Sequence, residues 1–132
     1  EGHLIADELL EDNARTIVGP VISERCKPEL RNHTIETAGV LNKAGVPMCI
    51  CTDHPVVPEQ YLPLSAGLAV RGGLDRDEAL KAITIYPAVI TGIADRVGSI
   101  EVGKDADIVI FSGDPLSVCD TPDMVIVNGT VI

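Results

Sequence analysis

Val46-Pro47-Met48-Cys49-Ile50-Cys51-Thr52-Asp53-His54-Pro55 combines a run of apolar and small side chains with an ionisable pair at its end. No polar alternation interrupts the run up to Thr52, which is typical of a parallel strand covered on both faces. Asp53 and His54 follow at the carboxyl end, where α/β folds build their sites. The segment therefore predicts an α/β fold and raises the question of what Asp53 does at the end of the strand.

The role of Asp53 has two interpretations on these residues alone. Strand alternation would place the side chains of Cys49, Cys51 and Asp53 on one face, with the cysteines forming the floor of a site. The simpler interpretation is that Asp53 caps the segment after the strand, and the local pattern favours it. His54 would face away from Asp53 along an extended strand, which favours a supporting contact over direct metal ligation.

Charge and composition exclude several classes of function. The 20 acidic residues against 10 basic ones give a formal net charge of -10, and there is no basic patch for nucleic acid or an anionic membrane. No apolar run approaches membrane-spanning length. The cysteines, Cys26, Cys49, Cys51 and Cys119, lack a paired C-x-x-C spacing. They predict reduced thiols in a cytoplasmic protein, ahead of a redox or metal-thiolate module on Cys49 and Cys51.

The first half of the chain alternates helices and strands. An apolar stripe predicts a helix over residues 3–12, and residues 15–19 have the pattern of a short strand. A helix over about residues 34–44, ended by Gly45, precedes the central strand. This alternation describes βα units of a parallel sheet. The chain begins at Glu1 in what resembles the interior of a helix, which predicts a fragment or a processed product.

The second half continues with helices and closes with β structure. Helices are expected over residues 62–71, 76–85 and 87–92, with Asp75 as the amino-terminal cap of the second. A turn-rich connector over residues 98–107 leads to a strand at 108–111. Asn128-Gly129 between two β-branched runs is a strong hairpin signal. Antiparallel structure is therefore expected at the end of the chain.

Four motifs together resemble one family. They are the strand ending Thr52-Asp53-His54-Pro55, the helix pair joined through Ile83-Thr84-Ile85-Tyr86-Pro87-Ala88, the run Gly98-Ser99-Ile100-Glu101-Val102-Gly103-Lys104-Asp105-Ala106-Asp107-Ile108-Val109, and the closing Val127-Asn128-Gly129. In this order they are similar to the C-terminal part of metal-dependent amidohydrolases, above all the imidazolonepropionase-like branch. The resemblance implies a (β/α)8 barrel with a small β-sandwich. Residues 1–97 would hold the last two barrel strands with their helices, and residues 98–132 a sandwich segment.

The resemblance also implies roles for individual residues. Asp53 matches the aspartate that ends barrel strand eight, which in the family is a metal ligand and the proton shuttle of hydrolysis. A divalent metal is implied, with zinc expected from the family's usage. Glu1-Gly2-His3 resembles the segment just after the strand-six histidine, and His3 is a candidate for that metal ligand, although it stands a few residues late, inside the following helix. The other family ligands would precede residue 1.

Two further side chains are candidates for contact with substrate. Arg25 lies in the loop after the first predicted strand, where a solvated surface position is the simpler interpretation and contact with a substrate anion the functional one. His54 adjoins Asp53 and would line the same mouth. Both are therefore predicted as substrate-binding residues.

The sequence leaves two functions open. The first is hydrolysis of a C–N bond in a small molecule, such as a cyclic amide, an amidine or an N-acyl compound, by a metal-activated water with Asp53 as general acid and base. The second is a non-catalytic structural fragment. Two barrel strands leave sheet edges uncovered, so this fragment would associate with another copy or with a missing N-terminal part.

Overall fold

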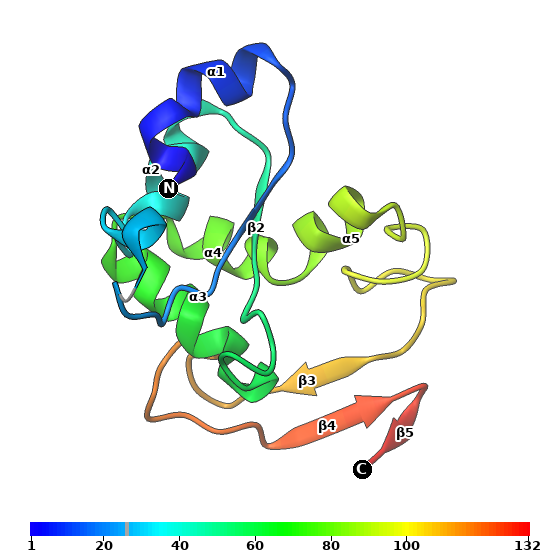
Figure 1. The fold of residues 1–132 in the computed structure, drawn as a ribbon. Coiled ribbons are helices and arrows are strands. Elements are labelled where there is room, and N and C mark those ends of the chain that lie inside the picture. The colour runs from blue at the N-terminus through cyan, green and yellow to red at the C-terminus, as the bar shows by residue number, and fades with distance from the viewer. Residues whose placement is uncertain (26) are drawn as a thin grey trace.

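The computed structural model, which describes residues 1–25 and 27–132, places helices around a short parallel sheet and ends in an antiparallel sheet (Figure 1). The strands are β1 (Thr16–Val18), β2 (Met48–Ile50), β3 (Ile108–Ile110), β4 (Met124–Val127) and β5 (Thr130–Val131). The α-helices are α1 (Ala6–Glu11), α2 (Thr37–Ala44), α3 (Leu62–Arg71), α4 (Arg76–Ala82) and α5 (Ile85–Thr91). Short 3-10 helices are η1 (Gly2–Ile5), η2 (Pro28–Leu30) and η3 (Glu59–Tyr61). The α/β class is as the sequence predicts.

The parallel sheet consists of β1 and β2. Thr16 pairs with Met48 and Val18 with Ile50, and every residue of β2 is buried, which confirms the buried parallel strand. β2 is shorter than the predicted run because the chain turns at Asp53, whose φ is 55°. The pairing still extends one residue further, since the Cys51 amide donates to the Val18 carbonyl oxygen at 2.9 Å.

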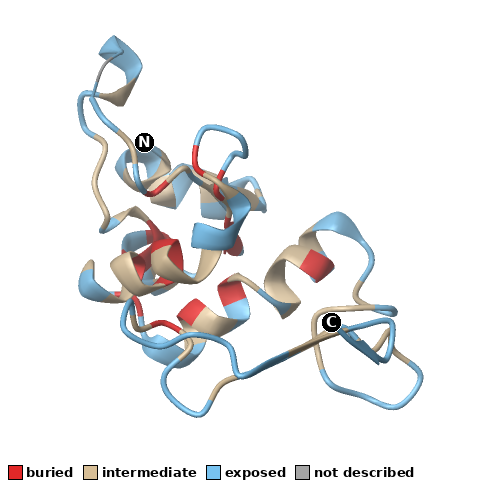
Figure 2. Cartoon of the chain, turned by 90° about the horizontal axis from the view of Figure 1, so that it is seen from below, coloured by how far each residue is buried: buried red, intermediate tan, exposed pale blue. Residues whose placement is uncertain are grey.

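The hydrophobic core lies where β2 meets α2, α3 and α4, and Figure 2 shows the buried residues gathered there. Leu41 of α2 is 1% exposed and packs in this cluster. α3 and α4 contribute small buried residues, which let the two helices approach closely: Ala66, Ala69, Ala79 and Ala82. The core therefore combines a buried strand with closely packed helices.

The N-terminal helix is partly as predicted. The expected helix over residues 3–12 begins as η1 and continues as α1, and neither element contains a buried residue. Leu9 packs against the core, whereas Leu4 is 58% exposed. α1 and the antiparallel sheet lie at opposite ends of the molecule (Figure 1). Of the helices that the structure describes, none has the length and apolarity to span a membrane.

Several helices end at the expected signals, although α5 begins at Ile85, two residues before the predicted start at Pro87. α2 ends at Gly45 with φ 82° and α5 at Gly92 with φ 77°, the left-handed conformation that glycine adopts easily. Asp75 caps α4, because its Oδ1 accepts hydrogen bonds from the amides of Asp77 at 2.9 Å and Glu78 at 3.2 Å. The Asp75 cap is thus confirmed, although α4 ends earlier than predicted, at Ala82.

Asp75→Ala should lower the free energy of unfolding by about 1 kcal/mol, because two amides at the start of α4 lose their acceptor. Urea denaturation followed by circular dichroism would measure the change. Asp75→Asn keeps a side-chain oxygen at the same position and should cost less than half as much. Equal losses for the two variants would contradict the cap.

Glu78 joins three helices through its carboxylate. Its Oε2 accepts hydrogen bonds from the hydroxyl of Tyr86 on α5 at 2.6 Å and from Nδ2 of Asn42 on α2 at 3.2 Å. Its Oε1 pairs with Lys81 Nζ at 2.7 Å. The ammonium group of Lys81, followed by the Tyr86 hydroxyl, holds the pKa of the Glu78 carboxyl below its ordinary value of 4.5. The charged form of Glu78 is therefore the one that the fold stabilises.

Acid should remove the contribution of Glu78 to stability. Because its pKa is lower in the folded state, the contribution is present above about pH 4.5 and is lost as the pH falls through the lowered pKa of the folded carboxyl. Wild type should therefore exceed Glu78→Gln in thermal stability at pH 7, and the gap should narrow below pH 4.5. Glu11→Gln, at an exposed glutamate, controls for the lost charge. A difference in thermal stability that stays constant with pH would contradict the stabilising role of the charged Glu78 carboxylate.

The antiparallel sheet is attached to the helices by the loop between β3 and β4. β4 pairs with β3 and with β5, and the turn between β4 and β5 has φ 49° at Asn128 and 76° at Gly129, as the hairpin signal predicts. In the β3–β4 loop, Leu116 is buried in the core cluster. Asp114 of the same loop pairs with Arg76 of α4 at 2.7 Å. The sheet and the helical part thus share side-chain packing.

Candidate active site

The carboxyl ends of β1 and β2 form one mouth. The strands are parallel and in register, so the segments that leave them emerge at the same edge of the sheet. Gly19 follows β1 and lies directly against Cys51, where a Cβ atom would collide with the Cys51 carbonyl oxygen. The absence of a side chain at Gly19 therefore lets the two exits meet.

Asp53 lies in a turn at this mouth. Its backbone is left-handed, with φ 55°, a conformation that aspartate tolerates better than most residues. Its carbonyl oxygen accepts a hydrogen bond from the Val56 amide at 2.9 Å, which closes the turn. The expected alternation of Cys49, Cys51 and Asp53 on one strand face is therefore wrong, because the extended backbone ends before Asp53. The side chain of Asp53 is exposed.

The strand cysteines have the character of core thiols. Cys49 is buried and Cys51 is half-buried. Burial, and secondarily the neighbouring Cys51, raises the pKa of the Cys49 thiol. The neutral thiol is thus favoured over the thiolate that metal binding or redox chemistry needs. Cys26, included in the prediction of reduced thiols, lies outside the described residues.

The other predicted site residues have these positions. His3, in η1, is half-buried, and its Nδ1 lies 2.9 Å from the Thr37 hydroxyl. His54 is exposed in the turn beside Asp53, and the extended strand that would have turned its side chain away from Asp53 is not formed. The guanidinium group of Arg25 donates two hydrogen bonds to the His33 carbonyl oxygen, from Nη2 at 2.8 Å and from Nε at 3.1 Å. The roles given to these residues stay predictions.

The described residues do not assemble a metal centre by themselves. Within residues 1–25 and 27–132, no three side chains of histidine, cysteine, aspartate or glutamate come together as metal ligands. His3 and Asp53 therefore have no third such ligand within this part of the chain. A complete metal site does not fit the residues present, and no chemical step can be assigned to a metal within them.

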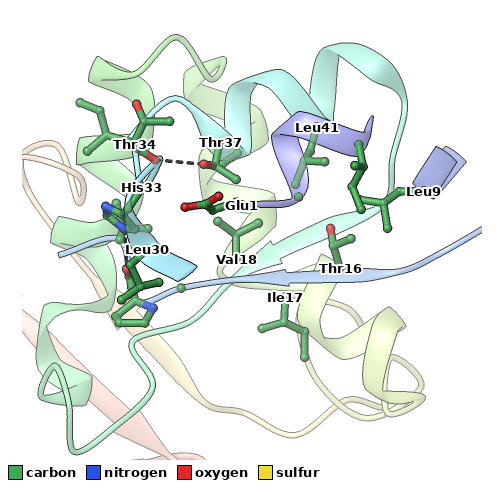
Figure 3. Close-up of a pocket in the computed structure, with 17 residues that line it drawn as sticks. Glu1, Leu9, Thr16, Ile17, Val18, Leu30, His33, Thr34, Thr37 and Leu41 are labelled. Atoms are coloured by element: carbon green, nitrogen blue, oxygen red, sulfur yellow. Dashed lines mark hydrogen bonds between the residues drawn. The ribbon is translucent and has the colours of Figure 1, made fainter. Parts of the chain in front are cut away.

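A groove of about 320 Å³ lies beside β1, bounded by η1 and α2 (Figure 3). Its lining includes Val18 and Pro20 on one side and His33 and Thr37 on another. His33 is half-buried, and its Nε2 lies 3.1 Å from the Pro20 carbonyl oxygen. Sequence patterns assign His33 no role, because its partner is 13 positions away and no local signal marks the contact. None of the described lining residues belongs to the Asp53 turn.

The sequence profile of the amidohydrolase family matches residues 4–132. The chain therefore belongs to the amidohydrolase family, a family of hydrolases, as the sequence motifs predict.

Individual relatives agree with this assignment. The chain is 35% identical over 104 residues to the amidohydrolase tasK of Hapsidospora irregularis, covering 79% of this chain and 11% of that protein. It is 41% identical over 70 residues to an imidazolonepropionase of Thermoplasma acidophilum, covering 52% and 17%. The structure of an amidohydrolase from Thermotoga maritima matches it with a TM-score of 0.94 at 38% identity, over 99% of this chain and 34% of that one. The chain thus spans a minor part of the length of each relative.

Proposed function

We propose that this chain is the C-terminal part of an enzyme that hydrolyses C–N bonds in small molecules. Residues 1–97 would supply the last two strands and helices of a (β/α)8 barrel, and residues 98–132 a segment of a β-sandwich. The observation that carries this proposal is the likeness to the Thermotoga maritima amidohydrolase, which extends over 99% of this chain but only 34% of that protein.

Asp53 is the proposed catalytic residue. It stands just past the carboxyl end of a buried parallel strand, where barrel enzymes place catalytic groups, and it is exposed to solvent. A carboxylate in this position can accept a proton from an attacking water molecule and return it to the departing nitrogen. His54, in the same turn, is the proposed contact with substrate, and contact of Arg25, in the loop after β1, with a substrate anion stays the alternative that the sequence predicts.

A divalent metal, with zinc expected from the family's usage, belongs to the proposal. Asp53 would be one ligand and His3 a second candidate. Because the described residues do not complete a metal site, further ligands would come from polypeptide outside them. A cytoplasmic location and the absence of nucleic-acid and membrane partners, inferred from the thiols and the charge of -10, complete the proposal.

Exposed apolar side chains favour the alternative of a non-catalytic fragment that associates with another copy. Ile17, in the middle of β1, is 59% exposed, although its strand lies beside a fully buried one. An uncovered apolar strand invites pairing with other polypeptide. Light scattering that shows a stable monomer at high concentration would count against self-association.

A chimera tests the catalytic proposal. Residues 1–132 would replace the matching third of the Thermotoga maritima amidohydrolase, which preserves the rest of a related fold. The chimera should bind a divalent metal, measured by elemental analysis, and hydrolyse N-acyl compounds, cyclic amides or amidines. A folded, metal-loaded chimera that hydrolyses no C–N bond that the parent enzyme hydrolyses would contradict the proposal.

A further inference from the structure

The loop that follows β1 is tied back onto the segment before α2. The Pro20 carbonyl oxygen is 3.1 Å from His33 Nε2, and Arg25 binds the carbonyl oxygen of the same histidine. These contacts, here called the His33 clasp, hold both ends of the loop over residues 20–25. The contact of His33 with Pro20 lies at the wall of the groove in Figure 3.

The chemistry of the clasp fixes its donors and acceptors. A proline carbonyl oxygen can only accept a hydrogen bond, so Nε2 of His33 must carry the proton. The main-chain oxygen of His33 accepts two hydrogen bonds from one guanidinium group, at 2.8 and 3.1 Å. His33 thus donates through its side chain and accepts through its backbone, and it holds both ends of the loop.

The loop begins at the mouth that holds Asp53. Gly19, which precedes the loop, lies against Cys51, and Asp53 is two residues beyond Cys51. A change in the course of the loop at Pro20 would therefore act directly beside the contact between Gly19 and Cys51. The clasp is placed to hold the exit of β1 against Cys51, two residues before Asp53.

We infer that Arg25 and His33 are positioning residues, which hold the loop over residues 20–25 at the mouth of the active site, and that Arg25 does not bind a substrate anion. The edge of the guanidinium group formed by Nε and Nη2 is one of the two edges that can bind a carboxylate with two hydrogen bonds. In Arg25 that edge is already occupied by the His33 carbonyl oxygen. The part of this inference that concerns the active site rests on the proposed function.

Limited proteolysis of this chain tests the clasp without any substrate. Glu24 is exposed within the loop, so a glutamate-specific protease reports how easily the loop opens. His33→Ala should speed cleavage after Glu24 about fivefold, the effect of losing one hydrogen bond. His33→Gln keeps a donor that can reach Pro20 and should cleave nearly as slowly as wild type.

Two controls distinguish local opening of the loop from unfolding of the whole molecule. Cleavage after Glu101, in a distant exposed turn, should keep its wild-type rate in the same digest, which excludes general unfolding. Arg31→Ala removes an exposed arginine from the same stretch of chain and should leave cleavage after Glu24 unchanged. Equal cleavage after Glu24 in His33→Ala and wild type would overturn the clasp.

Activity of the chimera separates positioning from substrate binding. The probes are an N-acyl amino acid and its uncharged methylamide. Arg25→Ala should lower kcat/KM about equally for both, since a displaced loop affects either substrate. A rise in KM confined to the anionic substrate would overturn the inference and return Arg25 to the role of an anion anchor. If neither probe is hydrolysed, the proposed function fails for this class of substrate, and the proteolysis result still decides the clasp.

Discussion

Asp53→Asn should lower kcat of the chimera at least about 100-fold, the contribution of a general acid and base. Asparagine has nearly the same size and can remain in the left-handed turn, so the fold at the mouth should persist. What is lost is the ability to take up and return a proton. Initial rates of hydrolysis, together with metal content and circular dichroism, would measure the effect.

Asp95→Asn provides the matched control, because it makes the same chemical change at an exposed aspartate in the segment after α5. Its rate should equal that of the unmodified chimera. Full activity of Asp53→Asn at an unchanged metal content would mean that Asp53 takes no part in catalysis and serves only in the turn.

Leu41→Ala should lower the free energy of unfolding of the chain by about 3 kcal/mol, typical of a buried leucine truncated in a packed core. Leu41 is 1% exposed and packs from α2 into the cluster around β2. The neighbouring alanine side chains are too short to fill the space that the leucine leaves, so a cavity should remain. Urea denaturation followed by circular dichroism would measure the loss.

Leu4→Ala is the matched control, since Leu4 is 58% exposed in η1. It should change the free energy of unfolding by less than about 0.5 kcal/mol. Comparable losses for the two variants would mean that α2 does not pack on β2 in solution, or that Leu4 is covered by another copy of the chain. Light scattering on the wild-type chain would distinguish these two cases.

The features that could be predicted from the sequence depend on neighbouring residues. Gly45 ends α2, Asp75 caps α4, and Asn128-Gly129 forms the hairpin turn, because each conformation is set within a few residues. The buried character of β2 could be predicted equally well, since an uninterrupted apolar run is typical of a strand covered on both faces.

The features that could not be predicted depend on distant contacts. The turn at Asp53 shortens the strand, although aspartate is compatible with an extended or a left-handed backbone, and the local residues do not choose between them. The hydrogen bond between His33 and Pro20 joins residues 13 positions apart in the sequence, and the hydrogen bond between His3 and Thr37 joins residues 34 positions apart. A pattern of single residues carries no signal for such pairs, so the family resemblance located Asp53 while the loop geometry had to come from the structure.

The burial of Leu116 should couple unfolding of the antiparallel sheet to unfolding of the helical part. The strands of the antiparallel sheet begin at Ile108, yet Leu116 of the β3–β4 loop belongs to the hydrophobic cluster of the helical part, and Arg76 pairs with Asp114 of the same loop. The β3–β4 loop therefore cannot leave the helical part without opening that cluster to water. The two architectural parts should melt in one cooperative transition, and a calorimetric scan should contain a single peak.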